Sequence, residues 1–170
     1  MTDILPAASP KAMKLARRLL REGEIIAFPT DEGYYLGANA FERFAVRQLY
    51  TLSNRPPEQG LLVFIYQADD LNHVAQQVPN AAWPMLNQLW PGKLTVRLPK
   101  NPALPADVTG SHSTVAVRSP NHPLCLQLVV DFGRPLTVVS AAQRSPPRQR
   151  QPPPPAGTHS PGARWQPQPR

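Results

Sequence analysis

The chain has 170 residues, which favours a single domain, and its 41% hydrophobic content is compatible with a packed core. Its charge of +7 is uneven: the last 30 residues hold five Arg and no acid, which leaves 13 basic and 11 acidic side chains in the rest. One cysteine excludes an internal disulfide, no apolar run approaches the ~18 residues of a membrane span, and the residues after Met1 lack a signal peptide's apolar core. We therefore expect a cytoplasmic protein that does not enter a membrane.

The pattern predicts a helix first, with Ser9 as its N-cap, Pro10 at its first position and Gly23 after its last turn. Its basic residues are interpreted as a solvated face rather than a binding patch. A short apolar run at residues 25–28 predicts a buried strand that ends at Pro29. A polar loop is expected to follow.

The remaining elements alternate between helices and strands. Cys125 lies in the apolar run PLCLQLVV and is interpreted as a small buried hydrophobe rather than a nucleophile. Several strands are apolar on both faces, which predicts an α/β fold with a mixed or parallel sheet covered by helices. We expect helices at residues 42–52, 68–77, 81–89 and 123–132, strands at residues 61–65, 94–98, 114–118 and 136–139, and a loop at residues 29–37.

The end of the chain differs in composition from the rest, because the last 30 residues hold nine of the 23 prolines. Pro, Gln and Arg cannot bury enough apolar surface to offset the entropy of ordering. We therefore expect one domain over residues 1–145 and a disordered or polyproline-like tail over residues 146–170. A PxxP-type ligand at residues 152–155 is the alternative to a passive tail, and the abrupt break suggests a segment foreign to the fold.

Four segments at the ends of predicted strands carry candidate site residues, since open α/β sheets bind ligands there. PTDEGYYLG places Thr30 at a rigid turn, and SNRPPEQGLL places Arg55 before a proline. TVAVRSP ends a strand with Arg118, which either caps the sheet edge or binds an anion. TVVSAA places Ser140 before two small residues. An arginine fork suits phosphate or carboxylate, although a loop arginine is commonly only solvated.

Together with WPGKLT at residues 90–95, the order and spacing of these segments resemble the YrdC family of L-threonylcarbamoyladenylate synthases. The family pattern is PTxTxYGLG, KxRP, WPGxLT, TVAVRxP and SxNxSG, and the resemblance extends over residues 9–145. It implies a twisted mixed α/β sheet, flanked by helices, with a concave, positively charged cleft. It also implies synthesis of threonylcarbamoyl-AMP from L-threonine, bicarbonate and ATP with release of pyrophosphate, for the modification of position 37 of tRNA. Mg²⁺ is expected to accompany ATP, with no tightly bound cofactor and no protein metal site.

The resemblance also implies roles for individual residues. Thr30 and Arg118 would hold threonine, with Arg118 pairing its carboxylate. The nucleotide would be contacted by Arg55, Pro57, Thr114 and Ser140.

The chain departs from the family pattern at several positions, and the family domain continues beyond the last motif, so the resemblance implies a domain truncated at its C-terminus. Loss of the lysine of the KxRP motif is expected to lower the reaction rate roughly 10²–10³-fold. Glu32 is expected to repel ATP unless its side chain faces away from the nucleotide. The departures are Glu32 for the second Thr, Tyr35 for a Gly, Ser53 for the Lys, Ala142 for the Asn and Pro146 for a later Gly.

The leading hypothesis is therefore an enzyme whose activity the Ser53 and Ala142 replacements reduce. The alternative is a catalytically impaired homologue that binds nucleotide or RNA, with tRNA or double-stranded RNA as its partner and added affinity from the basic tail. Downstream tRNA threonylcarbamoyl-transfer proteins would be partners of the enzyme. A domain of hydrogenase-maturation carbamoyltransferases is disfavoured, because the chain lacks their zinc-finger-like cysteines. A misread product without a stable fold is the last alternative.

Overall fold

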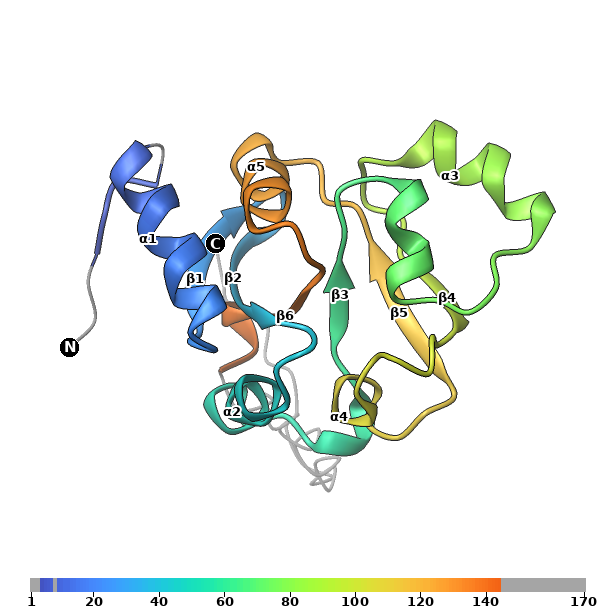
Figure 1. The fold of residues 1–170 in the computed structure, drawn as a ribbon, viewed down its shortest axis with the longest axis horizontal. Coiled ribbons are helices and arrows are strands. Elements are labelled where there is room, and N and C mark those ends of the chain that lie inside the picture. Colours follow the sequence, from blue (N-terminus) through green and yellow to red (C-terminus); the bar gives the residue numbers. More distant parts are fainter. Residues whose placement is uncertain (1–3, 8, 145–170) are drawn as a thin grey trace, which may run out of the picture.

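A computed structural model describes residues 4–7 and 9–144 of the chain (Figure 1). The predicted tail at residues 146–170 and the domain boundary at residue 145 lie outside these residues. Within the described residues the sheet has six strands in the order β1-β2-β6-β3-β5-β4, of which β3 and β5 pair in parallel. The prediction of a mixed α/β sheet is thus confirmed. The strands are β1 (Ile26–Thr30), β2 (Gly33–Asn39), β3 (Leu62–Phe64), β4 (Val96–Pro99), β5 (Thr114–Arg118) and β6 (Leu136–Ser140).

Helices cover both faces of this sheet. On one face α1 packs against α5 and both contact β1, whereas on the other α2 contacts β2 and β6 and lies beside α4 (Figure 1). A 3₁₀ helix, Ala68–His73, occupies part of the stretch that was expected to be helical over residues 68–77. The α-helices are α1 (Pro10–Arg21), α2 (Arg43–Ser53), α3 (Trp83–Leu89), α4 (Ala106–Thr109) and α5 (Pro123–Phe132).

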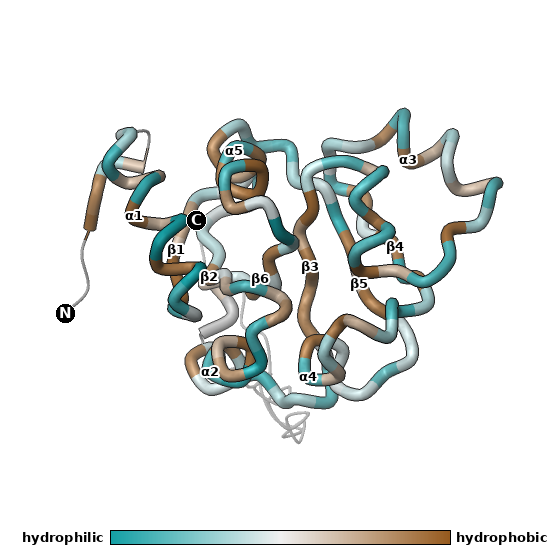
Figure 2. The backbone as a smooth tube through the Cα atoms, viewed as in Figure 1, coloured by the Kyte–Doolittle hydropathy of each residue, from teal (hydrophilic) through white to brown (hydrophobic). Residues whose placement is uncertain are grey.

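Alternation along the strands divides the core into two parts, because successive side chains of a strand point to opposite faces. Leu136 and Val138 of β6 join the cluster beneath α1 and α5, and Val139 joins the larger cluster on the other face. Figure 2 shows hydrophobic residues concentrated along β3 and β5, in the interior of the molecule. Most of the sheet is therefore buried on both sides, which is what the near-continuous apolar runs of the sequence predicted.

Two expectations about the first strands are wrong. β1 does not end at Pro29 but continues to Thr30, because β1 is an edge strand, where a proline without an N–H is tolerated. Residues 29–37 are not a loop: they form the end of β1, the turn at residues 31–32 and most of β2, which pairs antiparallel with β1. This hairpin brings the turn at residues 31–32 into the site described below.

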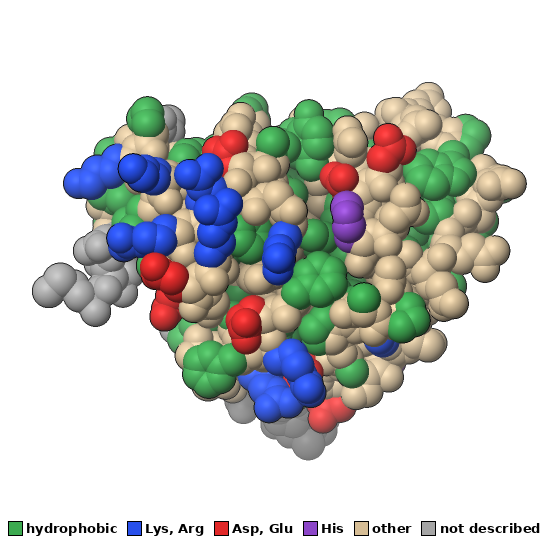
Figure 3. Space-filling view, in the orientation of Figure 1, with side chains coloured by type: hydrophobic (Ala, Val, Ile, Leu, Met, Phe, Trp, Pro, Cys, Tyr) green, Lys and Arg blue, Asp and Glu red, His purple; other side chains and the backbone are tan. Residues whose placement is uncertain are grey.

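The first helix forms as predicted. The Ser9 hydroxyl oxygen accepts a hydrogen bond from the Ala12 N–H at 3.1 Å, and Gly23 has a positive φ of 80° just beyond the last turn. Lys and Arg side chains gather over α1 on the face shown in Figure 3, and Arg18 forms an exposed ion pair with Glu22 at 3.7 Å. Within residues 4–7 and 9–144, the helices are too short or too polar to cross a membrane.

The single cysteine, Cys125, lies within α5 and is fully buried in the cluster beneath α1 and α5. Burial, followed by the nearby charge of Asp31, raises the pKa of its thiol to about 12. A thiol that stays protonated is a poor nucleophile. The interpretation of Cys125 as a buried hydrophobe is thus confirmed.

Two substitutions on α5 test which face of this helix supports the fold. Leu128→Ala should lower the free energy of unfolding by about 2–5 kcal/mol, because Leu128 is buried in the cluster and truncation leaves a cavity. Val130→Ala, on the exposed face of the same helix, should change it by no more than about 0.5 kcal/mol. Urea unfolding followed by circular dichroism measures both, and equal losses would contradict the packing of α5.

Candidate functional site

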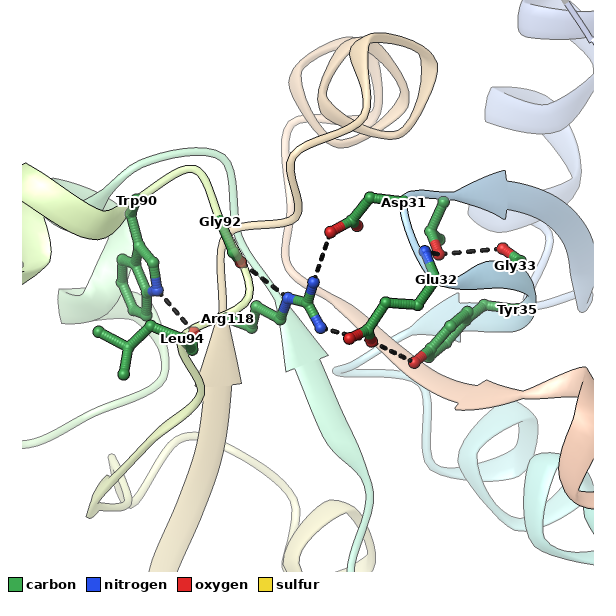
Figure 4. A network of polar contacts seen from close by, with 9 residues as sticks. Asp31, Glu32, Gly33, Tyr35, Trp90, Gly92, Leu94 and Arg118 are labelled. Atoms are coloured by element: carbon green, nitrogen blue, oxygen red, sulfur yellow. Dashed lines mark hydrogen bonds and ion pairs between the residues drawn. The ribbon is translucent and has the colours of Figure 1, made fainter.

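The site begins at the turn between β1 and β2, which a threonine hydroxyl shapes. The Thr30 hydroxyl donates to the Gly33 carbonyl at 2.9 Å, and its oxygen accepts from the Glu32 N–H at 3.1 Å. Gly33 has a φ of +118°, which side-chain-bearing residues rarely adopt. These contacts hold the turn closed, so that Asp31 and Glu32 project toward Arg118 (Figure 4).

Arg118, the last residue of β5, meets that turn. Its side chain is only 4% exposed. Nη1 lies 2.5 Å from a Glu32 carboxylate oxygen, and Nη2 lies 2.6 Å from Asp31 Oδ2 (Figure 4). Nε donates to the Gly92 carbonyl at 2.8 Å. All three guanidinium nitrogens therefore have acceptors within the chain, and two of those acceptors are carboxylates.

The WPGKLT segment supplies the other support for Arg118. The Gly92 N–H donates to the Ser119 carbonyl at 2.8 Å, while the Gly92 carbonyl accepts from Arg118. A Cβ at position 92 would collide with the Leu89 carbonyl oxygen, so the tight turn requires glycine here. The Trp90 indole N–H donates to the Leu94 carbonyl at 2.7 Å and holds the far side of the turn. The WPGKLT segment thus has a structural role, because its Gly92 carbonyl fixes the direction of the Arg118 side chain.

The charges around Arg118 are linked to a tyrosine. Burial alone would raise the pKa of Glu32, but the hydrogen bond and charge of Arg118 outweigh it and hold that pKa below its usual value. The Tyr35 hydroxyl donates to the same Glu32 oxygen at 3.1 Å. Burial, and then the bond to Glu32, raises the pKa of Tyr35. Its ring packs on Phe64 with centroids 5.5 Å apart. Glu32 is therefore ionised at neutral pH and held from two sides.

A second part of the site is a cavity of about 200 Å³. It contains two of the residues expected to contact nucleotide, Arg55 and Thr114, and a further arginine, Arg97. Two guanidinium groups beside hydroxyl groups suit the oxygens of a phosphate chain. The cavity is lined by Arg55, Gln59, Gly60, Leu61, Leu62, Thr95, Arg97, Thr109, Thr114 and Ala116.

The two parts lie on one face of the sheet. Thr114, Ala116 and Arg118 are alternate residues of β5, so their side chains point the same way. Thr114 and Ala116 are partly exposed, whereas the intervening valines are buried. At about 3.3 Å per residue, Thr114 and Arg118 are roughly 13 Å apart along the strand. Small Ala116 lies between them, so one elongated ligand could reach from the arginine to the cavity.

The other predicted residues lie apart from this cavity or have other contacts. Ser140 ends β6, and its hydroxyl oxygen accepts from the Ala142 N–H at 3.3 Å. Pro57 begins a short 3₁₀ helix and lines a different cavity, beside Arg43 and Arg47. Ser53 is buried and donates to the Leu49 carbonyl at 2.6 Å.

Sequence reasoning missed several residues of the site. Arg97 is opposite Ala116 in the β4–β5 ladder, which only the strand register reveals. Asp31 and Gly92 were within recognised motifs, but nothing in the sequence indicated that both would bind Arg118. Within the described part of the chain, no three His, Cys, Asp or Glu side chains are grouped as metal ligands.

Comparison with known proteins identifies the family. Residues 18–152 match the model of the Sua5, YciO and YrdC proteins, which carries the description "Telomere recombination". The chain is 37% identical over 135 residues to the threonylcarbamoyl-AMP synthase of Pseudomonas paraeruginosa, and the match covers 79% of this chain and 72% of that protein. A Bacillus subtilis threonylcarbamoyl-AMP synthase is 40% identical over 142 residues, or 83% of this chain. The chain therefore belongs to the Sua5/YciO/YrdC family.

Solved structures agree with this assignment. The structure of Pyrococcus abyssi Sua5 complexed with L-threonine superposes with a TM-score of 0.74 at 34% identity, over 81% of this chain and 40% of that one. Escherichia coli YciO superposes with a TM-score of 0.69 at 22% identity, which shows the common fold. The chain spans 38% of the P. abyssi synthase and 41% of the B. subtilis synthase.

The depressed pKa of Glu32 predicts a pH-dependent contribution to stability. The ionised form is bound in the folded state, so this contribution is complete above the usual value of 4.5 and is lost as the pH falls through the lower folded pKa. Glu32→Gln should therefore be less stable than the wild type at neutral pH, and the difference should shrink as the pH falls below 4.5. Thermal unfolding from pH 7 to pH 3 measures it, with Glu22→Gln as the control for an exposed carboxylate. A difference that stays constant across this range would contradict the ion pair.

Proposed function

We propose that the chain synthesises threonylcarbamoyl-AMP from L-threonine, bicarbonate and ATP and releases pyrophosphate. One observation carries the proposal: Arg118 and the Arg55–Arg97–Thr114 cavity lie on the same face of β5, with small Ala116 between them. This order suits a substrate with a carboxylate at one end and a phosphate chain at the other. The names of the similar synthases and the L-threonine complex of the P. abyssi protein support the same substrates.

In this proposal the threonine amine and bicarbonate give a carbamate and water. A carbamate oxygen then attacks the α-phosphorus of ATP, the bond from that phosphorus to the bridging oxygen of the β-phosphate breaks, and pyrophosphate leaves. The carbamate and ATP are both anionic, so the chain's contribution is charge neutralisation and positioning rather than a covalent nucleophile. Arg118 would pair the threonine carboxylate, while Thr30 fixes the turn that faces it.

The nucleotide would bind through its phosphates. Arg55, Arg97 and Thr114 line the cavity that would receive them, and Mg²⁺ would accompany the nucleotide and neutralise part of its charge. Ser140 would contribute its hydroxyl from the end of β6, on the face that carries Leu136 and Val138. Pro57 would contact the nucleotide from the 3₁₀ helix that precedes β3.

The proposed product is the donor for threonylcarbamoylation of adenosine 37 in tRNA. Transfer proteins of that modification would be the downstream partners, and the cytoplasm the compartment. The similar proteins, which are named as synthases, do not favour the alternative, a homologue that binds nucleotide without turnover, and this alternative rests on Ser53 alone. Its buried hydroxyl bonds to its own helix, so it offers no cation at the family's lysine position.

Pyrophosphate release by the purified full-length chain tests the proposal. With Mg-ATP, L-threonine and bicarbonate present, release should depend on each of the three, because all of them enter the product. ATP binding without threonine-dependent release would contradict the synthase activity and favour the nucleotide-binding alternative. Arg118→Gln should abolish the threonine-dependent release, with mass-spectrometric detection of threonylcarbamoyl-AMP as the second readout.

Arg97 provides a test of the nucleotide cavity. Arg97→Gln should weaken Mg-ATP binding roughly 10-fold or more, because a charge-assisted hydrogen bond to phosphate is worth about 1.5–3 kcal/mol. Arg18→Gln removes the same charge from exposed α1 and should leave ATP binding unchanged. Isothermal titration calorimetry measures both. Equal affinities of the Arg97 variant and the wild type would place the phosphates elsewhere.

A further inference from the structure

The guanidinium that would bind the substrate carboxylate is already occupied by carboxylates of the chain. Arg118 contacts Glu32 through Nη1, Asp31 through Nη2 and the Gly92 carbonyl through Nε. Its side chain is 4% exposed, so an incoming carboxylate cannot approach it without displacing one of these acceptors. One guanidinium faces two carboxylates, so the cluster of these three side chains carries a net negative charge and repels a further anion.

The two carboxylates differ in how readily they could move. The Asp31 side chain is 15% exposed, whereas that of Glu32 is 37% exposed and lies at the solvent side of the turn. The Glu32 side chain is flexible and takes no part in closing the turn, to which Glu32 contributes only its backbone N–H. It can therefore rotate away while the turn at Thr30 stays closed. Of the two, Glu32 is the group that a ligand would displace.

Tyr35 opposes this rotation. Its hydroxyl donates to the Glu32 oxygen that also accepts from Arg118. Its ring is fixed against Phe64 in the core, so the hydroxyl is held in one place. Tyr35 and Glu32 are both residues at which the chain departs from the motif of residues 29–37, and they contact each other. The two departures are therefore coupled, because the Tyr35 hydroxyl holds the Glu32 carboxylate in place.

We propose that Glu32 is an internal competitor for the carboxylate of the amino-acid substrate at Arg118, and that Tyr35 positions it there. Substrate binds when Glu32 rotates to solvent, and Asp31 and Gly92 continue to hold the arginine. Glu32 and Tyr35 together set the apparent affinity for the amino acid. A ligand that binds only when Glu32 has left Arg118 has its affinity multiplied by the fraction of molecules in that state. This inference rests on the proposed function, in which Arg118 binds the threonine carboxylate.

Calorimetric titration of the full-length chain with L-threonine tests the proposal. Glu32→Gln and Glu32→Ala should bind L-threonine about 10-fold more tightly than the wild type, because a weaker competitor or none remains. Glu22→Gln removes an equal charge from exposed α1 and should bind like the wild type. L-threoninamide lacks the carboxylate, so neither Glu32 variant should bind it more tightly. Thermal unfolding midpoints establish that each variant is folded.

Tyr35→Phe separates positioning from packing. It keeps the ring on Phe64 and removes only the hydroxyl, so it should tighten threonine binding several-fold in the wild-type background. In the Glu32→Ala background the same change should have no effect, because the hydroxyl acts through that carboxylate. A purely structural role of Tyr35 would give the same effect in both backgrounds.

The outcomes separate the two proposals. Equal threonine affinities of the wild type and both Glu32 variants would overturn the competition and leave the proposed function standing. Weaker binding by the Glu32 variants would overturn it as well, because Glu32 would then be part of the binding site. Threonine binding by none of the proteins, the Glu32 variants included, would overturn both the competition and the amino-acid site at Arg118.

Discussion

A buried arginine requires acceptors for all of its nitrogens, and Arg118 imposes that requirement on three segments that are distant in the sequence. The β1–β2 turn supplies two carboxylates, the turn at Gly92 supplies a carbonyl, and β5 supplies the arginine itself. The turns at Thr30 and at Gly92 meet this requirement, because each one directs an acceptor toward the guanidinium: carboxylates at the first turn and a carbonyl at the second. In the proposed function, a substrate carboxylate would replace the more exposed of the two carboxylates on Arg118, that of Glu32.

The proposed anion site and the proposed nucleotide cavity lie at two positions along one strand. Alternate residues of β5 project to one face, so Thr114 lines the cavity, Ala116 leaves space and Arg118 lies at the proposed carboxylate position. Arg97 reaches the same face because it is opposite Ala116 in the neighbouring strand. Charge neutralisation at both ends suits the proposed reaction between an anionic carbamate and the phosphates of a nucleotide.

Much of the fold could be predicted from the sequence, because its elements carry local signals. α5 has Pro123 in its first turn and Gly133 as its C-cap, and both predicted ends agree with the structure. β2 was missed, because Pro29 suggested a break and the Gly- and Tyr-rich residues that follow suggested a loop. Arg118 and Arg55 were recognised from motifs. The contact of Arg118 with Glu32 spans 86 residues of sequence, so no local pattern could indicate that a carboxylate of the chain would occupy the arginine.

The central claim is that Arg118 is a carboxylate site from which Glu32 must move. A crystal structure of the full-length chain with L-threonine tests it most directly, with the ligand-free crystal as the reference. The account predicts the threonine carboxylate within hydrogen-bonding distance of the Arg118 guanidinium, with the Glu32 side chain turned to solvent and Asp31 still in place. Threonine bound elsewhere, with Glu32 remaining on Arg118, would contradict it.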